Sequence, residues 1–405
     1  MNLPPPESRR SPPPAPPVRP LPPTSRTVRW LAAALGAGLG LGCAEIAVRL
    51  VAPQASYATE RFYAADPALG WKLASDLDVE FTNRADFRVR VRTDPRGLRV
   101  GTPESGAESD AGRPAVLAVG DSFTFGWGVE EDDTFVARAA SAAGAQAWNA
   151  GVPLYDVCQE ADRASALLDE LAPRVVVLAI FLGNDESDAL TDRHAFDVRS
   201  GAIVARGPVS AGARLRRFLW QPLLDRSHLL RLLRNSAPIA WLQHAVLGST
   251  SFSRWVAEQR LTVFRVPATA GILEGDRRLL TCARRLQERV AAKGSALVAL
   301  LVPDQLEVQP ERLAETAREL RVPLDAVDAA APRRRIAPPL VALGIPVVDP
   351  LADLVVAEAS GPLYFRQDPH MTARGHAVLA RALAPVLEKF LGTPSKPEAA
   401  VRVLP

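Results

Sequence analysis

Residues 115–129 read AVLAVGDSFTFGWGV, an unbroken apolar run from Ala115 to Val119 followed at once by the small polar turn Gly120-Asp121-Ser122. Such a run predicts a strand buried on both faces of a sheet, and the turn presents one serine at its end. Serine, aspartate and glycine are also ordinary loop residues, so the turn alone does not distinguish a nucleophile from a loop residue.

The pattern of the strand at 115–119 recurs along the chain. Strand-like apolar runs alternate with helix-like segments, and this order predicts an α/β fold with a parallel sheet and right-handed crossovers. Ligands of such sheets bind beyond the carboxyl ends of the strands, which is where Ser122 falls. The further runs are 174–181, 296–303 and 345–350, and the helix-like segments are 133–144, 161–173 and 276–294.

Composition excludes several classes of protein. The 405 residues carry a net charge of only +3, so the composition does not indicate the strongly basic surface that binds nucleic acid. The three cysteines, Cys43, Cys158 and Cys282, are far apart and lack metal-ligand spacing, so neither a disulfide framework nor a zinc site is predicted. A single bridge between Cys158 and Cys282 remains open for a domain outside the cytoplasm. No cofactor and no metal are expected.

The N-terminal region predicts a membrane segment. Residues 1–28 are rich in proline and arginine and predict a disordered cytoplasmic tail. Residues 29–52 form a transmembrane anchor, in which Glu45 and Arg49 are spaced to pair, and the preceding arginines place the rest of the chain in the periplasm. The alternatives are a cleaved signal peptide, a lipoprotein signal at Cys43 and a buried helix.

The remaining organisation is assigned by pattern. Residues 53–113 predict a small β-rich lead-in, because Phe87, Val89 and Val91 alternate with arginines. Residues 114–390 form the α/β domain, and 191–270 interrupt it with a basic amphipathic insertion that either packs on the domain or lies on lipid. Residues 391–405 form a flexible tail.

The chemistry of Ser122 depends on a base. Of the five histidines, His370 stands in the loop YFRQDPHMT, two residues after Asp368. A carboxylate at this spacing can accept from the imidazole N–H and leave the other ring nitrogen free to take a proton from a serine. We expect Ser122 as nucleophile, His370 as base and Asp368 as its orienting acid. Thr372 is expected to cap the following helix.

An acyl-transfer site also needs donors for the oxyanion. Ser122 offers its own backbone N–H at a helix start. Gly151 in WNAGVPLYD allows a close backbone approach, and Asn184 in FLGNDESD follows the apolar run 174–181 directly. Each of these features alone is weak, and their common position at strand ends makes them candidates for an oxyanion hole.

These blocks together resemble the SGNH (GDSL-type) hydrolase superfamily, with GDSF at Ser122, NAGV at Gly151, GND at Asn184 and DPH at His370. The resemblance covers roughly 114–390 and implies a flavodoxin-like three-layer α/β/α sandwich with these four residues in the site. The membrane segment also looks like that of membrane-anchored bacterial members. Many members place the acid three residues before the histidine, whereas the spacing of two here resembles the alginate O-acetyltransferase-like branch.

The expected activity is that of a serine-dependent ester hydrolase that forms an acyl-enzyme on acylated cell-surface or exported glycans or related small esters. The alternatives are an O-acetyltransferase that modifies an exopolysaccharide, a lipase or thioesterase, and a non-catalytic glycan-binding protein. Phe123, Phe125 and Trp127 would suit a lipid substrate or equally a helix packed on the sheet.

Overall fold

The computed structural model describes residues 25–54, 62–83, 85–102, 112–190, 193–206, 212, 226–235 and 252–392. Most of the predicted N-terminal tail, nearly all of the predicted C-terminal tail and much of the predicted insertion lie outside the described residues.

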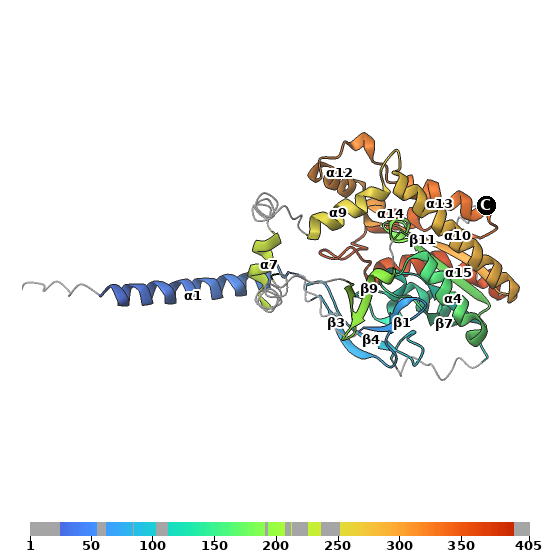
Figure 1. Cartoon of the computed structure of the whole chain (residues 1–405), viewed down its shortest axis with the longest axis horizontal. Coiled ribbons are helices and arrows are strands. Elements are labelled where there is room, and N and C mark those ends of the chain that lie inside the picture. The colour runs from blue at the N-terminus through green and yellow to red at the C-terminus, as the bar shows by residue number, and fades with distance from the viewer. Residues whose placement is uncertain are drawn as a thin grey trace, which may run out of the picture.

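The long apolar N-terminal segment is a helix, α1 (Arg26–Val51), and it extends away from the central part of the structure (Figure 1). The Ser25 hydroxyl accepts from the Val28 N–H at 3.3 Å and caps its first turn. None of its residues is buried, and its length and hydropathy are sufficient to cross a membrane, a test that a signal sequence also passes.

The centre of the protein is a mixed sheet. Within the described residues its eight strands follow the order β12-β11-β8-β6-β7-β5-β4-β3. The first five of these are mutually parallel: β12 (Val347–Val348), β11 (Ala296–Val302), β8 (Val175–Phe181), β6 (Ala115–Val119) and β7 (Gln146–Asn149). The other three are antiparallel: β5 (Arg99–Val100), β4 (Arg88–Thr93) and β3 (Asp78–Thr82). The predicted α/β fold with a largely parallel sheet is confirmed.

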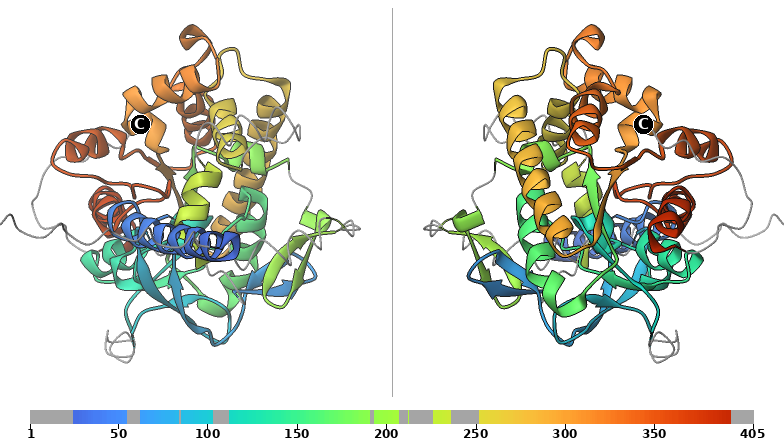
Figure 2. Two further views of the ribbon diagram at one scale, coloured as in Figure 1. Left: turned by 90° about the vertical axis from the view of Figure 1, so that its left-hand side faces the viewer. Right: turned by 90° about the vertical axis from the view of Figure 1, so that its right-hand side faces the viewer.

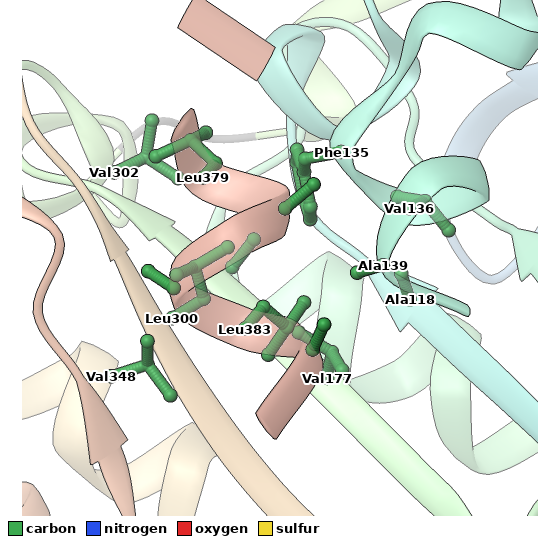
Figure 3. Close-up of a cluster of buried hydrophobic side chains, with 14 of the residues drawn as sticks. Ala118, Phe135, Val136, Ala139, Val177, Leu300, Val302, Val348, Leu379 and Leu383 are labelled. Atoms are coloured by element: carbon green, nitrogen blue, oxygen red, sulfur yellow. The ribbon is translucent and has the colours of Figure 1, made fainter. Parts of the chain in front are cut away.

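Helices cover both faces of the parallel strands. One face carries α3 (Phe135–Ala142), α14 (Leu351–Glu358) and α15 (Ala373–Leu391), and the other carries α4 (Val157–Leu171), α10 (Ala270–Ala292) and α13 (Ala331–Ala342). Alternate residues of one strand serve the two faces: Val177 packs under α15 and α3, as Figure 3 shows, whereas Val176 packs on the opposite side. Because both faces are buried, the strands read as continuous apolar runs.

A disulfide joins Cys158 on α4 to Cys282 on α10. The sequence left this bridge open, and the structure contains it, closing a loop of 124 residues across one face of the sheet. Disulfides persist in oxidising compartments outside the cytoplasm.

An aromatic cluster fills the corner where the antiparallel strands meet the domain. It includes Phe62, Trp71, Phe81 and Tyr155, all buried. Two hairpins lie here, β1 (Tyr63–Asp66) with β2 (Gly70–Leu73) and β9 (Phe196–Arg199) with β10 (Ala202–Ala205) (Figure 2). The remaining elements are α2 (Ser122–Phe125), η3 (Glu131–Asp133), α5 (Asp185–Asp188), η4 (Arg193–Ala195), α7 (His228–Asn235), α9 (Phe252–Val263), α11 (Gln305–Val308), α12 (Pro310–Glu319) and η5 (Leu324–Ala326).

Candidate functional site

Ser122 is the first residue of α2, directly after β6. The Asp121 carboxylate caps this helix by accepting from the Phe123 N–H at 2.8 Å. Gly120 is required at the end of the strand, because a Cβ there would lie 2.0 Å from the Thr124 hydroxyl oxygen. The strand, the glycine and the cap therefore fix the position of the serine at the carboxyl edge of the sheet.

The serine hydroxyl belongs to a chain of hydrogen bonds. Ser122 Oγ lies 2.7 Å from His370 Nε2, and His370 Nδ1 lies 2.6 Å from Asp368 Oδ1. Asp368 is buried and also accepts from the His370 backbone N–H at 2.9 Å. These partners assign the imidazole proton to Nδ1, so that Nε2 can accept the serine proton. The geometry brings together the three residues predicted as nucleophile, base and acid.

Trp127 is a residue of this site whose contacts the sequence did not reveal. Its indole Nε1 donates to Asp368 Oδ2 at 3.1 Å, which leaves Oδ1 of the same carboxylate for the imidazole. Its ring stacks on His370 at a centroid distance of 5.3 Å, and Phe123 lies 4.8 Å from the imidazole as well. The imidazole is thus held by a carboxylate and contacts two aromatic rings.

The loop that carries Asp368 and His370 is tied back on itself. The Phe365 N–H donates to the His370 carbonyl at 3.0 Å, and the Thr372 N–H donates to the Leu363 carbonyl at 2.8 Å. The Thr372 side chain caps α15, as predicted from the sequence. The loop therefore enters α15 through a short hairpin that fixes the separation of the carboxylate and the imidazole.

Gly151 packs directly against α2. A Cβ at this position would lie 2.2 Å from the Phe125 backbone nitrogen, so only glycine fits. The neighbouring Val152 N–H donates to the Gly120 carbonyl at 3.0 Å, which places the loop beside the serine turn. The Gly151 N–H, predicted as an oxyanion donor, donates to the Asn149 side-chain oxygen at 3.0 Å in this structure.

Asn184 follows β8 and stands at the N-terminus of α5, so it also lies past the carboxyl end of a strand. Its side-chain oxygen is buried and has no hydrogen-bond partner among the described residues. The preceding Gly183 is required for space, because a Cβ there would lie 2.4 Å from Asp304 Oδ2. The contacts of the described residues include none that joins Asn184 or Gly151 to Ser122.

A buried arginine stabilises the turn that carries the serine. Arg99, on β5, donates to the carbonyls of Phe125, Gly126 and Val129 at 2.5 to 2.6 Å. It also pairs with Glu131 at 3.4 Å, and Glu131 accepts from the Asn149 amide at 3.0 Å. This series of contacts links the end of α2 to Asn149, whose side chain accepts from the Gly151 N–H. Sequence patterns did not indicate this role, because Arg99 lies in the predicted lead-in.

A cluster of buried carboxyl groups lies behind the serine turn. It comprises the buried Asp121, Asp156, Glu160 and Asp185 together with the half-buried Asp188. Burial raises the pKa of Glu160 well above its usual range, and the charges of Asp121, Asp156 and Asp188 raise it further. For the same reasons the pKa of Asp188 is raised to about 7. Neither oxygen of Glu160 has a hydrogen-bond partner among the described residues, so its neutral form is the one that the fold accommodates.

The other histidines lie elsewhere. His376 is buried in α15 and accepts from the Phe135 N–H at 3.2 Å, and His228 begins α7. His194 lies in η4, whereas His244 lies outside the described residues. No group of three or more histidine, cysteine or acidic side chains in the described part of the chain is arranged to hold a metal ion.

Comparison with protein families gives one match. The family described as "SGNH hydrolase-like domain, acetyltransferase AlgX" matches residues 267–403, which include Asp368 and His370. Over these residues, about a third of its length, the chain is similar to SGNH hydrolase-like domains of the AlgX acetyltransferase type. No curated protein matches the chain.

Several solved structures are similar at low sequence identity. LAE5, an alpha/beta hydrolase from the metagenome of Lake Arreo, is 12% identical over 69% of this chain and 96% of its own, with a TM-score of 0.37. Axe2, an acetylxylan esterase from Geobacillus stearothermophilus, is 12% identical over 70% and 95%, with a TM-score of 0.34. A lipolytic protein of the G-D-S-L family from Veillonella parvula is 12% identical over 67% and 97%, with a TM-score of 0.34.

Proposed function

We propose that this chain, with its SGNH hydrolase-like domain of the AlgX type, is an O-acyltransferase that moves acetyl groups onto the hydroxyls of an exported polysaccharide. The observation that carries the proposal is the chain of hydrogen bonds from Ser122 through His370 to Asp368, with distances of 2.7 and 2.6 Å. The family match supports transfer over the hydrolysis expected from the sequence, because it is to an acetyltransferase.

The first half-reaction forms an acyl-enzyme. Ser122 Oγ attacks the carbonyl carbon of the acyl donor as its proton passes to His370 Nε2. The Asp368 carboxylate stabilises the imidazolium through Nδ1. When the tetrahedral intermediate collapses, the bond to the leaving group breaks, and the leaving group departs with the proton from His370. The acetyl group is then an ester of Ser122.

The second half-reaction reverses these roles. A sugar hydroxyl attacks the acyl-enzyme, its proton passes to His370 Nε2, and the same proton returns to Ser122 Oγ as the serine departs. Water in place of the sugar would give hydrolysis. Transfer therefore depends on an acceptor that reaches the acyl-enzyme before water does.

The oxyanion of both intermediates needs N–H donors. In our proposal the Ser122 backbone N–H and the Asn184 side-chain amide donate directly. Asn184 lies past the carboxyl end of β8 at the N-terminus of α5, and its amide nitrogen is the atom that would donate. The Gly151 N–H joins them when Asn149 releases it, since the glycine lies against α2.

We further propose that α1 is an uncleaved anchor and that the α/β domain lies outside the cytoplasm. The exposed apolar surface of α1 and the disulfide support this location. An exported polysaccharide would meet the site in that compartment.

The test uses the full chain in detergent micelles with p-nitrophenyl acetate as donor and a deacetylated oligosaccharide as acceptor. We expect nitrophenol release together with an oligosaccharide that gains the mass of an acetyl group, and a Ser122→Ala variant that does neither. Ser165→Ala is the matched control, because Ser165 lies on α4 and its hydroxyl only donates to the Ala161 carbonyl.

Two outcomes count against the proposal. If Ser122→Ala releases nitrophenol as fast as the parent, the serine is not the nucleophile. If the parent yields only free acetate with every acceptor offered, the chain is a hydrolase and transfer is wrong.

A further inference from the structure

Helix α7 packs against α1. Figure 1 shows α7 beside the end of α1 that is nearer to the α/β domain. Because α1 is the candidate membrane segment, the position of α7 along it sets the depth of α7 relative to a bilayer.

Glu45 of α1 holds the start of α7. Its carboxylate accepts from Ser227 Oγ at 2.8 Å, from the His228 N–H at 2.9 Å and from the Leu229 N–H at 2.8 Å. It also pairs with Arg49 at 2.7 Å. A carboxylate on an otherwise apolar spanning helix is costly unless it is paired. Besides Arg49, the partners here are Ser227, His228 and Leu229 at the start of α7, so this end of α7 lies at the same depth as Glu45.

Helix geometry places that depth near the outer boundary of the membrane. Arg49 lies 20 residues after Arg29, which at about 1.5 Å per residue is about 30 Å, the thickness of a hydrocarbon core. With Arg29 at the cytoplasmic headgroups, Arg49 therefore reaches the opposite headgroup region, and Glu45 lies about one helical turn deeper.

The composition of α7 suits this boundary. Its sequence HLLRLLRN contains four leucines, and the Leu233 side chain is 46% exposed. A leucine left exposed beside a spanning helix is stabilised by lipid and not by water. An eight-residue helix would bind lipid weakly alone, but α1 already holds it at the surface.

We propose that α7 lies in the plane of the membrane at the outer headgroup boundary, with Leu233 in contact with phospholipid. This inference rests on the proposed anchoring by α1.

The arrangement also places the serine site close to the bilayer. The Gln54 N–H, just after α1, donates to His228 Nδ1 at 2.8 Å. The Gln367 side-chain amide donates to the Pro53 carbonyl, and Gln367 directly precedes Asp368. The loop that carries Asp368 and His370 is therefore bonded to the point where the chain leaves the membrane, and acyl transfer takes place at the membrane surface.

The test measures depth with a fluorophore on the full chain in phosphatidylcholine vesicles. Cys43→Ser removes the free thiol, and bimane is attached to a single new cysteine in each variant. Leu233→Cys reports on α7, Leu39→Cys on α1 is the reference inside the membrane, and Leu324→Cys on η5 is the reference in water. All three leucines are exposed in the protein, so the substitutions leave its core intact. Lipids brominated near the headgroup should quench the fluorophore at 233 at least half as strongly as deeply brominated lipids quench that at 39, and should not quench that at 324.

The outcomes separate the two proposals. If the fluorophore at 39 is quenched and that at 233 behaves like that at 324, the anchor stands and the position of α7 is wrong. If neither is quenched, α1 is not in the membrane and both proposals fail. A Glu45→Ala variant adds a second measurement, since it should lower the quenching at 233 and leave that at 39 unchanged.

Discussion

The Trp127→Phe substitution tests how the imidazole is held. Phenylalanine keeps an aromatic ring against His370 but cannot donate to Asp368 Oδ2, which the indole reaches at 3.1 Å. A hydrogen bond to a charged group contributes about 1.5–3 kcal/mol, so its full loss in the transition state lowers the rate about 10- to 150-fold. The loss should appear in the rate of acyl-enzyme formation, because the carboxylate is needed most when the imidazole becomes charged.

The assay is the rate at which a fluorophosphonate labels Ser122, together with the burst of nitrophenol from p-nitrophenyl acetate. Trp127→Leu removes the ring as well and should be slower still. Trp148→Phe is the control. Trp148 lies on β7, where its ring packs against the Arg96 guanidinium, so the labelling rate of this variant should equal that of the parent. A Trp127→Phe protein that labels as fast as the parent, while Trp127→Leu is slow, would show that only the ring matters and would refute the hydrogen-bond argument.

Three further predictions concern stability. Replacing Cys158 and Cys282 by serine should lower the free energy of unfolding by about 2–5 kcal/mol in urea titrations, because the bridge closes a loop of 124 residues; an unchanged midpoint would count against it. Burial lowers the pKa of His376 to about 3, so its stabilising contribution is complete above pH 6.5 and is lost as the pH falls toward 3. His376→Asn should therefore reduce the loss of stability between pH 7 and pH 5 by about 2 kcal/mol, and parallel pH curves for the two proteins would contradict this. Burial raises the pKa of Glu160, so the parent should lose stability as the pH rises above the pKa of an unfolded glutamate, by up to about 1.4 kcal/mol per unit, and Glu160→Gln should show a shallower fall; an equal or steeper fall would exclude a protonated Glu160.

The sequence predicted the parts of the fold that local patterns encode. Apolar runs buried on both faces gave the strands at 115–119, 175–181 and 296–302, and their carboxyl ends gave Ser122 and Asn184. The strand β7 (Gln146–Asn149) was not predicted, because it is short and mostly half-buried and therefore lacks an apolar run. The helix α10 begins at Ala270, six residues before the predicted segment, where Thr269 caps it.

The contacts of Trp127 and Arg99 could not be predicted in this way. Trp127 donates to a carboxylate 241 positions away, and the bonds of Arg99 to the serine turn span up to 30 positions. Arg99 lies in the predicted β-rich lead-in, and the aromatic pattern at Trp127 suits a lipid substrate or a helix packed on the sheet equally well. Their roles arise from tertiary packing, and a single sequence holds no local signal for them.

The loop that carries His370 also sets when the protein can act. Ser122 and His370 are 248 positions apart, and His370 lies three residues before α15. A chain that emerges from the N-terminus presents the serine long before the imidazole. In our scheme the partly exported protein cannot form an acyl-enzyme, and reactivity begins only when the C-terminal loop has docked. In our scheme, docking of this loop is therefore the event that completes the serine site.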